Sequence, residues 1–200
     1  MRQTLRVAVL LCASLFIAAG TSLAQGTRGE WSGGWRHLYV AGSDGEDGVN
    51  FPRGWYVDVA LHLNEMFSVV GDVGGNYKSE DITEVFQGIT VTGNADASVH
   101  TFMGGLRVRS SGNPAVVPYG QILFGGAHAG FDVEASSVVN GQTITVSDDD
   151  SETEAAMSIG GGVNLGTPYV AIRLHAEWLK ILQEDSGNAF RFAVGVVVPF

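Results

Sequence analysis

Cysteine is almost absent from this sequence. The one cysteine, Cys12, follows Leu10 and Leu11 inside an N-terminal apolar run, whereas a lipoprotein cleavage site has a small residue directly before its cysteine. We therefore expect no lipid anchor, and no disulfide framework, cysteine-based metal site or thiol nucleophile in the rest of the chain. The fold must be stabilised by other interactions.

Basic residues are also scarce. The chain has 11 Lys and Arg against 21 Asp and Glu, and two of the basic residues, Arg2 and Arg6, lie in the extreme N-terminal segment. Without those two, 9 basic residues stand against 21 acidic ones, a net charge of −12. Because nucleic-acid binding depends on neutralising phosphates with Lys and Arg, we expect no nucleic-acid partner.

Long apolar segments are the third absence. Beyond the N-terminal run, no stretch reaches the roughly 18 consecutive apolar residues that identify a transmembrane helix. Charged residues nevertheless make up only 16% of the chain, and 28 of its 200 residues are Gly. The composition excludes a helical membrane protein and remains compatible with a β protein.

The N-terminus has the pattern of a cleavable signal peptide. Arg2 and Arg6 precede an apolar run over residues 7–19, and Ser22-Leu23-Ala24 supplies a small-x-small cleavage site. We therefore predict a signal peptide over residues 1–24. A retained anchor is the weaker alternative, because the run is shorter than the about 20 residues that span a bilayer.

The remaining chain has the length of one domain. We assign residues 25–33 to an N-terminal periplasmic segment and residues 34–200 to a barrel domain. Alternating polarity predicts eight strands in that domain, at residues 34–41, 54–63, 66–77, 98–109, 116–133, 154–165, 169–182 and 188–200.

The expected connections alternate between long and short. The first, third, fifth and seventh are loops, and the others are tight turns with signals such as Gly112-Asn113-Pro114. This asymmetry is typical of a transmembrane barrel with short periplasmic turns and longer outer loops, and an even strand count puts both termini on the periplasmic side. The long connections cover residues 42–53, 78–97, 134–153 and 183–187.

The final strand shows the alternation most clearly. Large apolar residues occupy every even position from Phe190 to Phe200, whereas the odd positions carry Arg191 and mostly small residues. The strands at residues 54–63 and 169–182 alternate in the same way. A soluble barrel, such as a lipocalin-like binder, would turn the large apolar face inward, and a transmembrane barrel would turn it outward.

Three observations favour the transmembrane arrangement. The apolar faces lack charge over lengths that suit a tilted transmembrane strand. The polar faces carry charges of both signs, as a packed ionic interior would. Aromatic residues gather near strand ends, where membrane interfaces favour them, and the expected interface aromatics are Trp55, Tyr77, Trp178 and Phe200. The sequence therefore predicts an all-β, eight-stranded antiparallel up-and-down transmembrane β-barrel.

The same alternation predicts a network of charges inside the barrel. An eight-stranded barrel is only wide enough for side chains to fill it, and unpaired charges at low dielectric are costly. We expect a closed plug of ion pairs, with a gated ion path as the alternative. The predicted network comprises Asp58, Asp72, Arg107, Arg109, Arg173, Glu177 and Arg191, while the facing of the first strand stays open.

Several segments resemble the bacterial outer-membrane protein β-barrel domain family. They are Gly54-Trp55, the run NEMFSVVGDVGGNY over residues 64–77, the run VPYGQILFGGAHAGF over residues 117–131 and the terminal FRFAVGVVVPF. The resemblance covers essentially the whole mature chain. It implies contact with outer-membrane lipid and lipopolysaccharide, and recognition of the last strand, ending at Phe200, by the outer-membrane assembly machinery. Pro199 departs from the pattern, because it lacks a ladder N–H.

No residue set stands out as catalytic. His175 and Glu177 share one strand face, but the nearby Ser158 is expected inside the barrel, away from any lipid substrate. The acidic run over residues 148–152 lacks the Gly and terminal Glu of a calcium loop, so we interpret it as a solvated loop rather than a Ca²⁺ site. We expect no enzyme, no cofactor and no metal.

The sequence thus predicts a non-enzymatic outer-membrane barrel with a structural or surface-interaction role and acidic outer loops. A narrow passive channel for ions or small solutes is the alternative, and a lipid-modifying outer-membrane enzyme is a more distant one.

Overall fold

The computed structural model describes residues 29–42, 48–86, 89–139, 142–182 and 188–200. The predicted signal peptide, residues 1–24, lies outside the described residues, as do residues 43–47 and 183–187 of two expected loops. Within the described part of the chain, no helix is long and apolar enough to cross a membrane.

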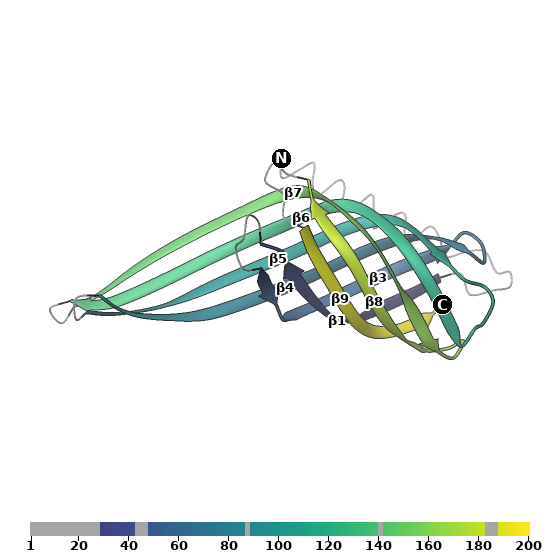
Figure 1. Ribbon diagram of the computed structural model, residues 1–200, viewed down its shortest axis with the longest axis horizontal. Helices are drawn as coiled ribbons and strands as arrows, with labels where there is room; N and C mark the ends of the chain where they lie inside the picture. Colours follow the sequence, from purple (N-terminus) through teal and green to yellow (C-terminus); the bar gives the residue numbers. More distant parts are fainter. Residues whose placement is uncertain (1–28, 43–47, 87–88, 140–141, 183–187) are drawn as a thin grey trace.

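Antiparallel strands form a closed ring in the order β1-β3-β4-β5-β6-β7-β8-β9, and β9 pairs back onto β1 (Figure 1). The three-residue β2 pairs with β1 beside the ring. The eight-stranded up-and-down barrel predicted from the sequence is therefore confirmed. Its elements are β1 (Gly29–Val40), β2 (Val49–Phe51), β3 (Arg53–His62), β4 (Phe67–Phe86), β5 (Ile89–Arg109), β6 (Val116–Val139), β7 (Gln142–Gly166), β8 (Ala171–Ile181) and β9 (Asn188–Pro199).

β1 begins at Gly29, earlier than the predicted residue 34. Residues 29–33, which we had assigned to a periplasmic segment, pair on one side with β3 and on the other with the end of β9. The alternation continues through them, because Trp31 faces outward while Glu30 and Ser32 are buried. The even-numbered side chains of the first strand therefore point into the barrel.

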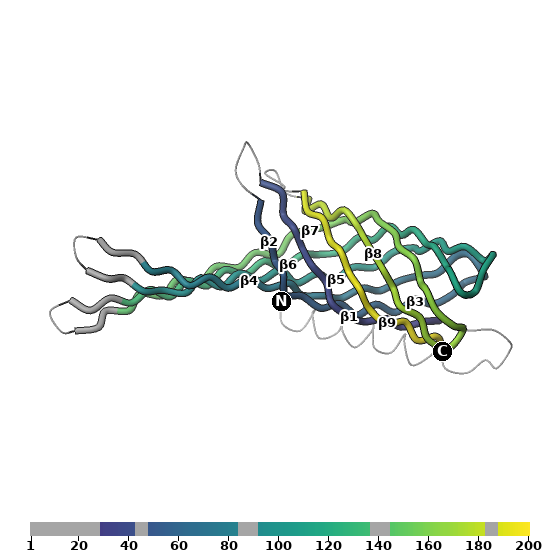
Figure 2. The backbone as a smooth tube through the Cα atoms, turned by 60° about the horizontal axis from the view of Figure 1, so that its bottom comes forward, coloured from purple at the N-terminus to yellow at the C-terminus, as the bar shows by residue number. Residues whose placement is uncertain are grey.

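Four strands extend far beyond the ring. Residues 78–97 and 134–153 were expected as loops, and their described parts, residues 78–86, 89–97, 134–139 and 142–153, extend β4, β5, β6 and β7 as paired strands. Together, residues 78–86, 89–97, 129–139 and 142–155 form a four-stranded sheet that projects from one end of the barrel (Figures 1 and 2). We call it the projecting sheet. The projecting sheet is rich in Thr, Val and Ile, which favour extended backbone.

Within the described residues, the two outer strands of the projecting sheet have no paired strand on their outer sides. β3 pairs with β4 only as far as Tyr77, and β8 pairs with β7 only from Ala156 onward. Both chain ends of the described barrel lie at the opposite end, with the short turns, where Gly29 and Phe200 exchange backbone hydrogen bonds of 3.2 and 2.9 Å.

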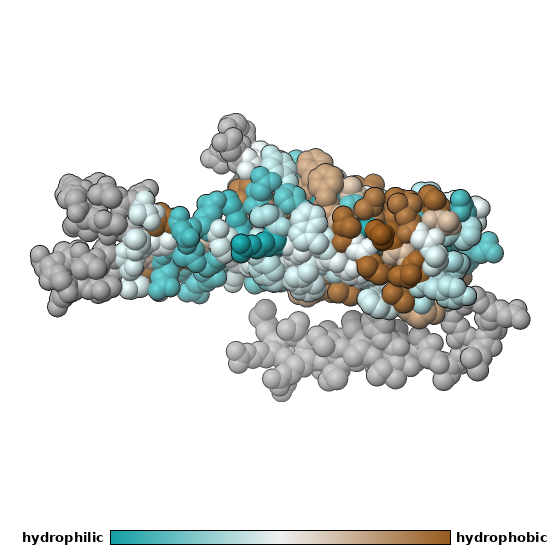
Figure 3. Space-filling view, turned by 90° about the horizontal axis from the view of Figure 1, so that it is seen from below, coloured by the Kyte–Doolittle hydropathy of each residue, from teal (hydrophilic) through white to brown (hydrophobic). Residues whose placement is uncertain are grey.

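The barrel is polar inside and apolar outside. Phe192 and Ile172 are 52% and 55% exposed, whereas Arg191 and Arg173 are 1% and 0% exposed. On the face shown in Figure 3, brown apolar surface gathers over the barrel and polar surface covers the projecting part. A transmembrane barrel has this polarity, and a soluble barrel has the reverse.

An apolar cluster fills the end of the lumen that faces the long connections. Leu38, Leu179 and Ala189 lie near the corresponding ends of β1, β8 and β9 and are almost completely buried. Ala127 and Ala156 join it from β6 and β7, where the projecting sheet begins, and the cluster continues deeper into the barrel through Met103 and Leu123. The sequence predicted a polar plug, and this apolar cap is an addition to it.

Candidate functional site

The lumen near the short turns holds the first ion-pair cluster. Arg107 contacts Glu30 at 2.8 Å and Asp58 at 3.3 Å. Arg173 contacts the same two carboxylates, and its Nη1 lies 2.6 Å from Asp58 Oδ2. The hydroxyl of Ser32 donates to Asp58 at 2.7 Å. Residues from β1, β3, β5 and β8 thus meet on the barrel axis.

Neutral groups complete the coordination of both arginines. Gln121 accepts two hydrogen bonds from Arg107, at 2.9 and 2.7 Å, and Asn164 accepts one from Arg173 at 2.9 Å. Both guanidinium groups also contact the ring of Tyr119, with their Cζ atoms 4.6 and 4.9 Å from its centre. Such cation–π contacts are favourable when the cation is removed from water.

A second cluster lies nearer the apolar cap. Arg36 donates to both carboxylate oxygens of Asp72, at 3.2 and 2.6 Å. Arg191 contacts Glu177 at 2.8 Å, and Ser158 donates to Glu177 at 2.9 Å. Arg36 also lies 3.9 Å from Glu177, so the two pairs form one group.

His175 connects the two clusters. Its Nδ1 lies 2.8 Å from the hydroxyl oxygen of Tyr119, and the two rings stack with an interplanar angle of 4°. Its Nε2 lies 3.4 Å from Glu177 Oε1. A chain of polar contacts therefore runs along the lumen from Arg107 to Glu177.

The buried charges balance. Four arginines and four carboxylates lie in the lumen, each no more than 4% exposed. A buried charge that loses its partner is strongly destabilising. Removal of any one of these charges would therefore leave an opposite charge without its full complement of partners. The eight residues are Arg36, Arg107, Arg173, Arg191, Glu30, Asp58, Asp72 and Glu177.

The structure brings together six of the seven residues predicted for this network but not Arg109. Arg109 lies at the mouth with the short turns, where its Nε donates to the Glu65 carbonyl at 3.0 Å and its Nη1 lies 3.1 Å from His62 Nε2. The prediction missed Glu30 and Arg36, which belong to the first strand. Their even-numbered positions, continuous with Leu38, were the signal that could have found them.

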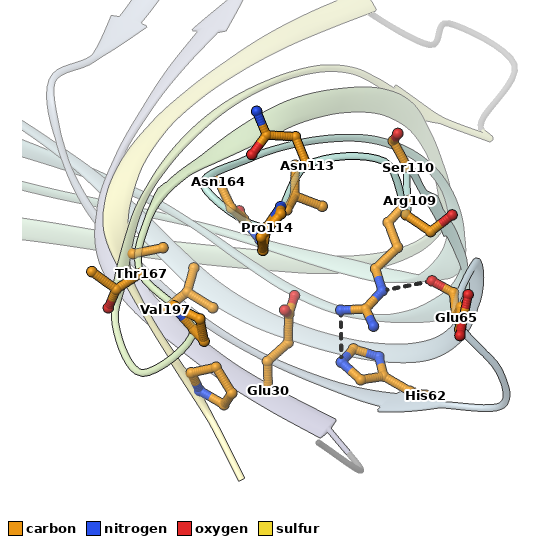
Figure 4. A pocket seen from close by; sticks show the side chains of 15 residues that line it. Glu30, His62, Glu65, Arg109, Ser110, Asn113, Pro114, Asn164, Thr167 and Val197 are labelled. Carbon is orange, nitrogen blue, oxygen red and sulfur yellow. Dashed lines mark hydrogen bonds between the residues drawn. The ribbon is translucent and has the colours of Figure 1, made fainter. Parts of the chain in front are cut away.

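A cavity of about 330 Å³ with both polar and apolar walls opens at that same mouth (Figure 4). Arg109 and His62 lie on one side of it, Thr167 and Val197 on the other, and Glu30 points into it between them. Glu30 also belongs to the first ion-pair cluster, so it connects the cavity to the filled lumen.

The four residues predicted at the membrane interface occupy different surroundings. Trp55 donates to the hydroxyl of Tyr77 at 3.2 Å, and that hydroxyl lies 2.9 Å from His100 Nε2, on the outer surface. Trp178 faces outward from β8 opposite Phe190. Phe200 is 54% exposed and follows the last strand at the end with the short turns.

The projecting sheet is strongly acidic. Its four segments carry eleven Asp and Glu residues and one basic residue, Lys78. Asp96, Asp132 and Asp149 lie directly opposite one another on three adjacent strands, on the face that continues the outside of the barrel. The run at residues 148–152, expected as a solvated loop, is part of β7. Within the described residues, no group of three or more His, Cys, Asp or Glu is placed to hold a metal ion.

The comparisons with known proteins agree on the fold. No protein-family model and no curated protein sequence matches this chain. The attachment invasion locus protein Ail of Yersinia pestis superimposes with a TM-score of 0.55 at 18% identity, over 86% of this chain and 97% of Ail. Neisserial surface protein A gives a TM-score of 0.57 at 13% identity, over 88% of this chain and 100% of that protein. The chain thus has the fold of small outer-membrane β-barrels.

Proposed function

We propose that this protein is a non-enzymatic outer-membrane barrel that holds the projecting sheet outside the cell as an interaction surface. The observation that carries the proposal is the contrast between the two parts of the molecule. The lumen is filled by paired charges and an apolar cap. In contrast, the described strands leave two edges of the projecting sheet without a paired strand, and unpaired strand edges are ready to bind other chains.

The proposed orientation follows from the two ends of the barrel. Short turns and both termini belong on the periplasmic side, and long connections belong outside. Lipid and lipopolysaccharide would contact the apolar outer surface of the barrel. The assembly machinery would act on β9, which ends at Pro199, and on Phe200 directly after it.

Proposed partners are cationic. The Ail structure has also been determined in complex with the heparin analogue sucrose octasulfate, with a TM-score of 0.57 to this chain. A polysulfate is anionic, and the projecting sheet here carries eleven acidic side chains against Lys78. Like charges repel, so electrostatic complementarity favours a basic partner for this chain.

The surroundings of the histidine and carboxylate pair support a non-enzymatic role. His175 and Glu177 are enclosed in the lumen. Ser158 donates to Glu177, so the hydroxyl is bonded to the carboxylate instead of to an imidazole base. In a serine-based catalytic triad, the histidine lies between the two.

The filled lumen predicts that the barrel does not conduct. In planar bilayers we expect no discrete channel openings above the baseline of the empty membrane, because the ion-pair clusters and the apolar cap occupy successive levels of the lumen. Single-channel recording is the measurement. A stable ohmic pore would favour the passive-channel alternative and contradict the closed interior.

The interaction role is tested by shortening the two long hairpins. Lys78 pairs with Ala97, and Ala129 pairs with Glu152, so an Asn-Gly turn can join each pair in register. A non-adherent bacterial host displaying the full chain should adhere to immobilised basic proteins and not to neutral or acidic ones. The shortened chain should lose that adhesion.

Heat-modifiable migration in detergent gels provides the control, because a folded barrel should persist in the shortened chain. Equal adhesion by the full-length and shortened chains would show that the projecting sheet is not the interaction surface.

A further inference from the structure

The two faces of the projecting sheet differ in chemistry. The alternation of β5 and β6 places only apolar or small residues on the face that continues the barrel interior, and these two strands are adjacent at the centre of the sheet. The resulting apolar strip comprises Gly93, Ala95, Ala97 and Val99 of β5 and Ala129, Phe131, Val133 and Ala135 of β6.

The apolar strip is uncovered in the described part of the chain. Phe131 at its centre is 51% exposed, and Val146 at its margin is 65% exposed. At its other end, Ala97 and Val99 pack against the apolar cap of the barrel. The strip therefore begins at a buried core and continues outward as open apolar surface, a feature that marks interaction sites.

Carboxylates line the β7 margin of the strip, where every second residue from Asp148 to Glu154 is acidic and lies on this face. On the β4 margin, Glu80 lies opposite Ala95 and forms an ion pair of 2.7 Å with Lys78. On β7, Glu152 and Glu154 lie close enough for a hydrogen bond that raises the pKa of Glu154. A cationic partner would neutralise the four carboxylates of this margin, whereas a second copy of the chain would add further negative charge.

The dimensions of the strip match one α-helix. Residues 93–99 of an extended strand span about 20 Å, and two adjacent strands present a width of about 10 Å. A helix with its side chains is about 10–12 Å wide, and about 13 helical residues cover 20 Å. Alternate residues on β7 are about 7 Å apart, close to the about 6 Å between helical residues i and i+4.

We propose that the apolar strip docks a cationic amphipathic helix of about four turns from another polypeptide. The apolar stripe of the helix would cover Phe131 and Val133, and basic side chains along one flank would meet the carboxylates of β7. The inference rests on the proposed function, since it assigns the interaction to one face of the projecting sheet and names the partner chemistry.

A synthetic peptide tests this assignment. A 15-residue Leu/Lys peptide with helical periodicity is titrated against the full chain in nanodiscs of zwitterionic lipid, with empty nanodiscs subtracted. A peptide of the same composition in scrambled order measures charge attraction alone. We expect the helical peptide to bind at least about tenfold tighter, because only it presents an apolar stripe to the strip.

Matched variants locate the binding face. Phe131→Ser should weaken binding of the helical peptide about tenfold, as expected for a central aromatic anchor. Asp150→Asn, on the strip side of β7, should weaken it about twofold to fivefold. Asp149→Asn, the adjacent residue on the opposite face, should leave it unchanged. The unaltered fold of each variant is checked by heat-modifiable migration.

Three results would overturn the proposal. They are equal binding of both peptides, equal effects of Asp149→Asn and Asp150→Asn, and a dimer of the free protein that depends on Phe131, which would assign the strip to a second copy.

In the adhesion assay, loss of binding on shortening the hairpins but not in Phe131→Ser would leave the proposed function standing and reject this helix site. Adhesion unaffected by either change would reject the proposed function itself.

Discussion

Replacement of Arg173 by Leu is expected to lower the free energy of unfolding by about 3–5 kcal/mol, the cost of breaking a buried ion pair from one side. Arg173 is fully buried and contacts both Glu30 and Asp58. Without it, two buried carboxylates share the single charge of Arg107. Urea titration of the barrel refolded in detergent micelles measures the difference.

Two further variants isolate the cause. Adding Asp58→Asn to Arg173→Leu restores one carboxylate to one arginine in this cluster, so the double variant should recover part of the lost stability. Arg109→Leu, at the open mouth, removes the same charge but contacts no carboxylate, and its cost should stay below about 1 kcal/mol. Equal losses in Arg173→Leu and Arg109→Leu, or no recovery in the double variant, would argue against a coupled network.

Phe192→Arg should cost about 2–4 kcal/mol in a bilayer, the depth-dependent cost of a charge facing the hydrocarbon of a membrane barrel. Phe192 faces outward in the middle of β9, beside Arg191, which faces the lumen and is paired. The contrast between these neighbours follows from the two-residue alternation of a strand. Refolding into phospholipid vesicles followed by urea titration gives the cost.

Phe192→Leu is the matched control, since it keeps an apolar side chain and should cost much less. If Phe192→Arg unfolded at the same urea concentration as Phe192→Leu, the outward face of β9 would not be in contact with lipid.

The polarity of the barrel was predictable because hydrocarbon and lumen make opposite demands on alternate residues. Over residues 190–200, six large apolar side chains at even positions and Arg191 at an odd one left only the choice between inside and outside. The absence of charge over a membrane-spanning length, together with charges of both signs on the other face, decided it. The inward positions of Asp58 and Glu177 followed from the same alternation.

The residues that form the ion-pair network were harder to predict from the sequence. Alternation gives the face of a residue but not its depth along the barrel axis, so Arg109 was grouped with Arg107 although it lies at the mouth. Glu30 and Arg36 were missed because adjacent glycines, Gly33 and Gly34, interrupt the pattern of the first strand. The partners depend on how the closed ring staggers its strands, which local sequence does not encode.

The projecting sheet was expected as loops because its outward face is polar and its strand edges carry acidic residues. Without a large apolar residue at every second position, the usual sign of a half-buried strand is weak. The remaining sign lies in the central strands, where small or apolar residues alternate with polar ones from Gly93 to Val99. Small residues such as Ala95 and Ala97 are a faint pattern, and only the register of the sheet shows that they adjoin Phe131 and Val133.

The pairing of β9 with β1 links assembly to charge neutralisation. Arg173 reaches Glu30 across 143 positions of the chain, and Arg107 reaches it across 77. A partly curled sheet entering the bilayer would therefore carry mutually separated cations and anions, each facing an incomplete lumen. Joining the first strand to the last brings these charges together and neutralises them, so insertion of the barrel should be all-or-none.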